Sequence, residues 1–225
     1  VRLEALEFYS ALEAVLGTSV ANLTVVDSEI GGGWGFSLFN ASRVLFQKNA
    51  VLWTAYGIRL VDSDNATIRE NRFANHGGGG VFLESSENVV VDSNSFAGPY
   101  GGGVVAVSSR RGLVVNNTFR DQSWAATLRD SVEFTFHHNE FRGNEVAAQD
   151  SFGPENVWDD GYPSGGNYWS EYVGEDRFRG PNQNLPGSDG IGDTPYRIDA
   201  DSVDRYPLYW HPVERPPVKP PIVGL

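Results

Sequence analysis

A chain of 225 residues, of which 40% are hydrophobic, is long enough to bury a core, and this excludes a disordered tail. The formal net charge of −12 excludes nucleic acid and anionic membranes as main partners, because both would be repelled. Cysteine and methionine are absent, which excludes disulfides and sulfur-ligated metal sites, and no apolar run reaches the roughly 20 residues that a membrane-spanning helix needs.

Residues 1–13 leave two interpretations open. Val1, Leu3 and Phe8 fit the inward positions of an incomplete, degenerate coil of the repeat that follows. Leu3, Leu6 and Phe8 fit equally well the inner side of a short capping helix. We therefore expect either a degenerate coil or an N-terminal cap over this range.

Residues 14–155 repeat with a period of 22 or 23 residues. The units start at small residues, namely Gly35, Gly57, Gly80, Gly103, Ala125 and Ala147. Apolar residues lie one and three positions after each of the first five starts, and in most units again nine and eleven positions after it. This alternation is typical of short strands separated by turns. The predicted fold is all-β, a right-handed parallel β-helix with about 22 residues per coil.

Two columns of the repeat predict contacts between successive coils. Fourteen residues after each of the first five starts lies an asparagine: Asn49, Asn71, Asn94, Asn117 and Asn139. We expect these amides to form a ladder at a bend, a structural and not a catalytic role, because an amide can both donate and accept hydrogen bonds. Two residues later a phenylalanine recurs, which predicts an internal column of rings.

Aromatic residues gather on one edge, just before the starts of the repeat units or near them. They are Trp34, Trp53, Tyr56, Tyr100 and Trp124. One hypothesis is a shallow platform on which a glycan stacks. The other is that the rings stack on one another and cover the turn. The outward columns of the repeat contain no carboxylate pair on adjacent coils, which disfavours catalysis on polysaccharide.

Four Asn-x-Ser/Thr triplets are candidate N-glycosylation sites of a surface protein. They begin at Asn22, Asn40, Asn65 and Asn116. Such triplets also arise by chance in turns that are rich in asparagine.

Residues 156–212 depart from the repeat and predict an irregular C-terminal cap with an acidic loop. Two carboxylates and an intervening carbonyl at one, three, five spacing can wrap a hard cation, and further acids follow: Asp189, Ile191, Asp193, Asp199 and Asp204. Oxygen ligands without cysteine favour a structural Ca²⁺. The alternative is a pair of Asp-Gly turns capped by their own side chains.

The histidines and the tail give weaker signals. His137 and His138 are adjacent in a predicted strand, where neighbouring side chains point to opposite faces, so we predict surface histidines and no chelating pair. Residues 213–225 are rich in proline, which predicts a stiff linker or tail.

The repeat and the closing segment resemble a known family. Versions of "GIRLVDSDNATIRENRF" (57–73) resemble NosD-like repeats and related carbohydrate-binding or sugar-hydrolase β-helix repeats. The segments "GYPSGGNYWSEY" (161–172), "GSDGIGDTPYRID" (187–199) and "DRYPL" (204–208) resemble the closing segment of NosD-like and archaeal cell-surface β-helix proteins.

This resemblance implies an exported protein at the cell surface or outside the cell. Its expected role is structural or glycan-binding, with glycans or other surface components as partners and with end-to-end self-association as a further possibility. The alternative is a polysaccharide lyase or hydrolase. The name of the family also implies copper, for which this chain lacks the usual sulfur ligands.

Overall fold

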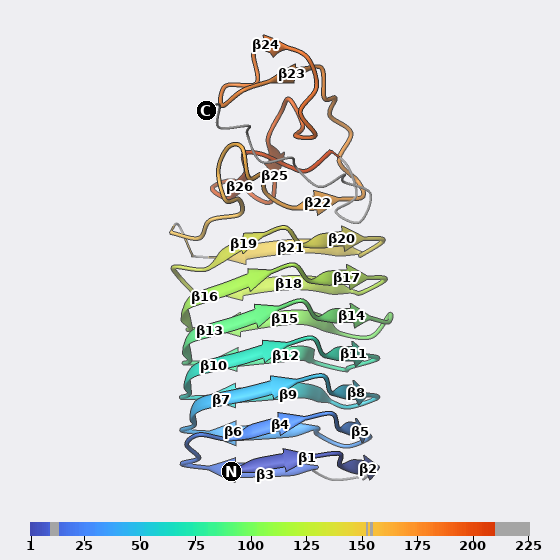
Figure 1. Ribbon diagram of the computed structural model, residues 1–225, viewed down its shortest axis with the longest axis vertical. Helices are drawn as coiled ribbons and strands as arrows, with labels where there is room; N and C mark the ends of the chain where they lie inside the picture. The colour runs from blue at the N-terminus through green and yellow to red at the C-terminus, as the bar shows by residue number, and fades with distance from the viewer. Residues whose placement is uncertain (10–13, 152, 154, 210–225) are drawn as a thin grey trace, which may run out of the picture.

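The computed structural model describes residues 1–9, 14–151, 153 and 155–209. Figure 1 shows a straight stack of coils, with the N-terminus at one end and an irregular segment at the other. Each coil contributes one short strand to each of three parallel sheets, and no helix occurs in the described ranges. The predicted parallel β-helix with about 22 residues per coil is therefore confirmed.

The three sheets run along the stack. Sheet A contains β1 (Arg2–Glu4), β4 (Thr24–Val26), β7 (Ser42–Gln47), β10 (Asp64–Arg69), β13 (Glu87–Asp92), β16 (Arg110–Val115) and β19 (Thr135–His137). Sheet B contains β2 (Glu7–Tyr9), β5 (Glu29–Gly31), β8 (Ala50–Leu52), β11 (Arg72–Ala74), β14 (Ser95–Ala97), β17 (Thr118–Arg120), β20 (Glu140–Arg142) and β22 (Tyr168–Trp169). Sheet C contains β3 (Val15–Thr18), β6 (Phe36–Phe39), β9 (Tyr56–Val61), β12 (Gly79–Glu84), β15 (Gly102–Val107), β18 (Trp124–Arg129) and β21 (Val146–Ser151).

The N-terminal residues form a coil and not a capping helix. Strand β1 pairs with β4, and β2 pairs with β5, in the same parallel register as the later coils. Residues 10–13 lie outside the described ranges.

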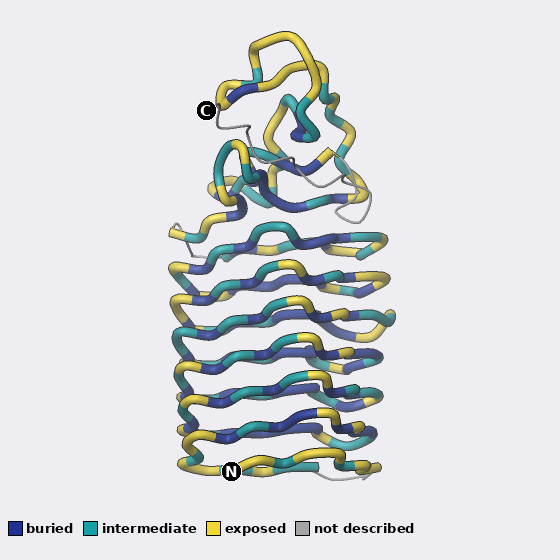
Figure 2. Tube along the Cα trace, viewed as in Figure 1, coloured by how far each residue is buried: buried dark blue, intermediate teal, exposed yellow. Residues whose placement is uncertain are grey.

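The core consists of columns of identical or similar side chains. The rings of Phe73, Phe96, Phe119 and Phe141 stack with centroids 4.8 to 4.9 Å apart and interplanar angles of at most 7°. Figure 2 shows buried residues alternating with intermediate and exposed ones along the coils, whereas the first coil is mostly exposed or intermediate.

The small residue at the start of each unit makes room for this column. A Cβ added to Gly57, Gly80 or Gly103 would lie 2.5 to 2.8 Å from the phenylalanine ring that follows sixteen residues later in the same unit. Close packing of this ring against the main chain therefore favours a small residue at the start of each unit.

Two hydrogen-bonded ladders close the corners of the coils. At the corner between sheets A and B, the main-chain NH of Asn71 donates to Asn94 Oδ1 over 2.9 Å, and Asn94 donates in the same way to Asn117. Ser28 begins this ladder and Asn167 ends it. At the corner between sheets C and A, hydroxyl groups accept main-chain NH groups in a second ladder formed by Ser63, Ser86, Ser109 and Ser131.

The cap continues the core before it closes it. Trp158 stacks on Phe136, and Trp169 stacks on Phe141, both with centroids 4.3 Å apart. Tyr196 then covers Trp169 at 4.2 Å. Two antiparallel hairpins complete the cap: β23 (Phe178–Arg179) with β24 (Leu185–Pro186), and β25 (Tyr196–Arg197) with β26 (Val203–Asp204).

Candidate functional site

Exposed aromatic side chains follow the corner between sheets B and C, which we call the aromatic edge. Its residues lie in the turns that enter β6, β9 and β15, and at the first positions of β9 and β18. The exposed fractions are 44% for Trp34, 65% for Trp53, 62% for Tyr100 and 49% for Trp124, whereas Tyr56 is half-buried. The structure thus brings all five predicted residues to one edge of the solenoid.

Tyr56 packs against neighbouring residues of the edge and exposes less of its ring than the other four aromatic residues. Its ring lies 5.6 Å from that of Trp34 and 4.9 Å from that of Phe82. A Cβ on Gly78 would lie 2.3 Å from the Tyr56 ring, so the ring rests on bare main chain. Mutual stacking therefore describes Trp34 and Tyr56, while the other three rings remain largely open to solvent.

The outer face of sheet C extends this surface with Arg59, Phe39 and Phe82. Arg59 lies over the rings of Phe39 and Phe82, at 5.3 and 5.9 Å from their centroids. It also pairs with Glu84 at 3.1 Å. An arginine that lies close to two rings adds a planar polar group beside the aromatic edge.

A polar groove runs along the opposite corner, between sheets A and B. One part has a volume of about 550 Å³ and is lined by Lys48, Glu70, Arg72, Ser93, Asn116 and Thr118, among others. A neighbouring part of about 390 Å³ is lined by Glu7, Asp27 and Glu29, and it shares Lys48 with the first.

This second part corrects the prediction that no carboxylate pair lies on adjacent coils. Glu7 and Glu29 are register partners in sheet B, and the Tyr9 hydroxyl donates to Glu29. The pair was missed because the first coil departs from the repeat, although its register with the second coil was visible in the sequence.

The acidic residues of the cap bind main-chain NH groups. Asp189 accepts the NH groups of Gly180 and Ile191, and Asp193 accepts those of Arg177 and Phe178, over 2.9 to 3.2 Å.

Asp199 lies in a separate turn, where it accepts two NH groups from the residues that follow it. Ile191 contributes a buried side chain to the cap. Among the described residues, no three histidine, aspartate or glutamate side chains gather around a common point that could hold a metal ion. The structure therefore does not bring the five predicted ligands together, and the calcium site stays a prediction.

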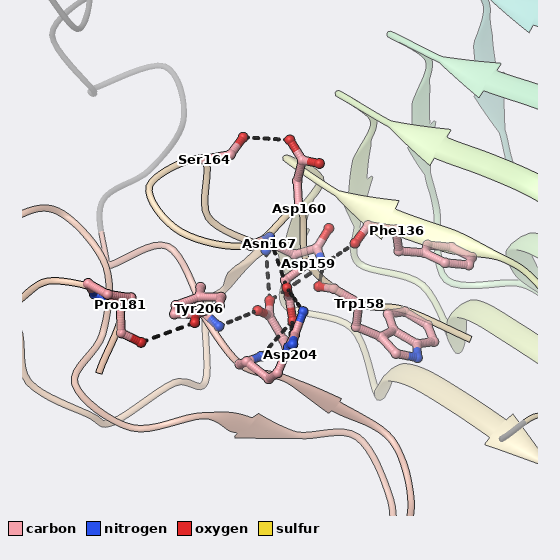
Figure 3. A network of polar contacts seen from close by, with 11 residues as sticks. Phe136, Trp158, Asp159, Asp160, Ser164, Asn167, Pro181, Asp204 and Tyr206 are labelled. Carbon is pink, nitrogen blue, oxygen red and sulfur yellow. Dashed lines mark hydrogen bonds and ion pairs between the residues drawn. The ribbon is translucent and has the colours of Figure 1, made fainter. Parts of the chain in front are cut away.

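Asp204 is fully buried at the join between the cap and the coils (Figure 3). Its carboxylate accepts the NH groups of Asn167, Tyr206 and the Trp169 indole over 2.7 to 3.1 Å. Burial raises the pKa of Asp204 to about 7, although these donors act in the opposite direction. The "GGNYW" and "DRYPL" segments thus meet at one carboxylate that ends the asparagine ladder.

The four candidate glycosylation asparagines are exposed. Each also has a positive φ, between 51° and 58°. Asparagine tolerates this conformation better than most residues, so turn geometry alone accounts for its presence there.

Parts of the chain lie outside the described residues. The proline-rich tail at 213–225 and His211 are among them. No helix within the described ranges is long and apolar enough to cross a membrane.

Comparisons with known proteins identify the family. No curated protein matches the chain. One solved structure, that of QnrB1, a plasmid-mediated fluoroquinolone resistance protein, is 8% identical, and the match covers 65% of this chain and 90% of that one with a TM-score of 0.22. The family model described as "Periplasmic copper-binding protein (NosD)" matches residues 9–174, which is most of the chain. The chain therefore belongs to the NosD family of β-helix proteins.

Proposed function

We propose that this protein is an exported β-helix module that binds polysaccharide along the aromatic edge. Membership of a family described as periplasmic supports export. The observation that carries the binding proposal is the gathering of Trp34, Trp53, Tyr100 and Trp124 on one edge, each more than 40% exposed. Large aromatic faces open to solvent are surfaces on which sugar rings stack.

The geometry favours an extended chain over a single sugar. Successive coils rise by about 4.8 Å, so the four rings from Trp34 to Trp124 are distributed over roughly 20 Å of the solenoid. A net charge of −12 disfavours anionic polysaccharides, so a neutral glycan is the proposed ligand.

Binding to a panel of neutral polysaccharides by calorimetry tests this proposal. The next coil shows which smaller residues the same positions accept. Asn75 occupies the position of Trp53 and Val146 that of Trp124, so the variants are Trp53→Asn and Trp124→Val. The double variant is expected to lose at least about tenfold in affinity. Phe178→Ala, an exposed ring in the cap, is the matched control and is expected to bind normally. Equal affinity in the double variant and the parent would refute the proposal.

The second candidate is a polysaccharide-active enzyme, favoured by the Glu7 and Glu29 pair beside the groove. Two carboxylates on one face are what glycoside hydrolysis requires. Release of reducing ends over a long incubation, abolished by Glu29→Gln, would support this candidate. Binding on the aromatic edge without any product release would support the binding module and argue against the enzyme.

We also retain three proposals from the sequence: calcium in the cap, glycosylation and end-to-end association. Calcium at Asp189 and Asp193 is expected to make a chelator lower the melting temperature. An unchanged melting curve would mean that the loop is stabilised by the hydrogen bonds of Asp189 and Asp193 to main-chain NH groups and not by a cation. Association is tested by light scattering, and glycosylation by intact mass after expression in a glycosylating host.

A further inference from the structure

The turn that enters β12 interrupts the row of rings on the aromatic edge. Along the stack it lies between the turn that contains Trp53 and the turn that contains Tyr100. Gly77 is exposed in this turn and holds the position that Tyr100 holds in the next coil, because the strands on both sides of the two turns keep one register. The row therefore has a gap, floored by main chain, between two exposed rings.

Neither packing nor backbone conformation explains the glycine at position 77. The nearest atom to an added Cβ would be 3.8 Å away, in Ala55, and the φ of Gly77 lies outside the left-handed region. Its neighbours differ, since a Cβ on Gly78 would collide with the Tyr56 ring and Gly101 has a φ of 84°. An exposed glycine that the fold does not require is typical of a place where a ligand approaches the main chain.

The main-chain carbonyls of Gly77 and Gly78 can accept hydrogen bonds from such a ligand. The NH groups of both residues donate to the preceding coil, over 3.1 Å to Thr54 and over 2.7 Å to Ala55. Among the residues that the structure describes, no NH group donates to either carbonyl, so the hydrogen bonding between coils is interrupted here. Sugar hydroxyl groups are donors that main-chain carbonyls accept.

The size of the gap and the shape of the edge restrict the ligand. Two coil steps of about 4.8 Å separate the turns of Trp53 and Tyr100, which leaves room for one sugar ring at contact distances of about 3.5 to 4.0 Å. The stack is straight (Figure 1), so a glycan that follows the edge has to be extended as well. Sugars joined by β-1,4 linkages form extended ribbons, whereas α-1,4-linked glucose curls into a helix.

We infer that the ligand is an unbranched, β-1,4-linked neutral glycan, one sugar of which lies on the main chain of Gly77 and Gly78 between Trp53 and Tyr100. This inference rests on the proposed binding of glycan to the aromatic edge, and it specifies the ligand and one subsite. A side chain at position 77 would occupy the space of that sugar and weaken binding.

Calorimetry with short oligosaccharides of one length tests the inference. The probes are the β-1,4-linked hexamers of glucose, mannose and N-acetylglucosamine, and the α-1,4-linked hexamer of glucose. The proteins are the parent, Gly77→Ala and Gly77→Leu, with Ser95→Leu as the matched control, because Ser95 is exposed in β14 and lies away from the aromatic edge. Melting temperatures identify a misfolded variant, and Gly77→Ala, whose Cβ has room, stays usable if Gly77→Leu is one.

The parent is expected to bind a β-linked hexamer at least about tenfold more tightly than the α-linked one. Gly77→Leu is expected to lose at least about tenfold in affinity, Gly77→Ala a smaller factor, and Ser95→Leu nothing. Parent-like affinity in both Gly77 variants, or equal binding of the two glucose hexamers, would overturn the inference. A loss confined to the Trp53 and Trp124 double variant would do so while leaving the proposed function intact, whereas a parent that binds no glycan would refute both.

Discussion

Adjacent asparagines in this protein have different physical roles. Asn116 is exposed and has a φ of 58°, so it satisfies a left-handed turn. Asn117 is buried, and its Oδ1 accepts both the main-chain NH and the side-chain amide of Asn94. Asparagine is thus favoured at position 116 by the backbone conformation and at position 117 by hydrogen bonding.

Substitution at these two positions separates the roles. Asn117→Ala leaves the buried main-chain NH of Asn94 without its acceptor and removes the hydrogen bonds that the Asn117 amide donates to the carbonyls of Val91 and Val115. It is expected to lower the free energy of unfolding by about 2 to 4 kcal/mol. Asn116→Gly keeps the left-handed turn and is expected to change it by less than about 1 kcal/mol. Urea denaturation measures both values, and similar losses would contradict the distinction.

His76 makes stability depend on pH. It is buried, its Nδ1 lies 2.7 Å from the Thr54 hydroxyl, and burial lowers its pKa to about 4. The unfolded chain binds a proton near pH 6.5, whereas the folded chain binds it only near pH 4. The contribution of His76 to stability is therefore fully present above about pH 6.5, and up to about 3 kcal/mol of it is lost as the pH falls to about 4.

The variant His76→Gln tests this, because glutamine does not titrate and Gln122 occupies a similar corner two coils away. Thermal unfolding between pH 4 and 8 is expected to show a smaller loss on acidification in the variant than in the parent. An equal loss of stability in the variant and the parent would mean that titratable groups other than His76 cause the acid sensitivity.

At the scale of the element, the residues of one coil stack on and hydrogen-bond to the equivalent residues of the coils on either side. A coil alone cannot bury its phenylalanine, which needs the ring of the adjacent coil on one face and a glycine beside it. Stability is then a sum of interfaces between coils, as in other solenoids.

Glycines only three residues apart should therefore respond differently to alanine. A Cβ on Gly80 would lie 2.6 Å from Phe96, whereas the nearest atom to a Cβ on Gly77 would be 3.8 Å away. Gly80→Ala is expected to cost about 1 to 3 kcal/mol, and Gly77→Ala almost nothing. Chemical denaturation measures the difference, and a comparable loss at Gly77 would argue against the packing explanation.

At the scale of the whole molecule, the cap covers the last coil. Trp158 and Trp169 lie on Phe136 and Phe141, and Asp204 receives the end of the ladder through Asn167. A chain that ends at residue 155 would lack both tryptophans and would expose Phe136 and Phe141 together with three strand edges. We expect it to form dimers or larger species in size-exclusion chromatography with light scattering. A monomeric truncated chain would show that the cap is dispensable for solubility.

Much of this architecture was accessible from the sequence, because the period, the asparagine column and the phenylalanine column each reflect one contact between coils. The contact between His137 and His138, whose Nδ1 atoms lie 3.1 Å apart, was not, since the rule that neighbours in a strand point apart fails where His138 turns to positive φ. The roles of Asp199 and Asp204 were also hidden. Acidic spacing alone does not distinguish a carboxylate that accepts NH groups from one that binds a cation.

The buried carboxylate of Asp204 also limits growth. Each asparagine of the ladder offers one amide oxygen to the coil before it and needs an acceptor from the coil after it. Asp204 lies where the next asparagine of the ladder would be, and its carboxylate accepts the hydrogen bonds of Asn167. An ionised carboxylate has no NH to donate to a further coil, so the ladder ends at this residue. Filaments built by adding coils at this end would first have to displace it. On this side the asparagine ladder thus ends at a carboxylate, beside the aromatic rings of the cap that cover the last coil.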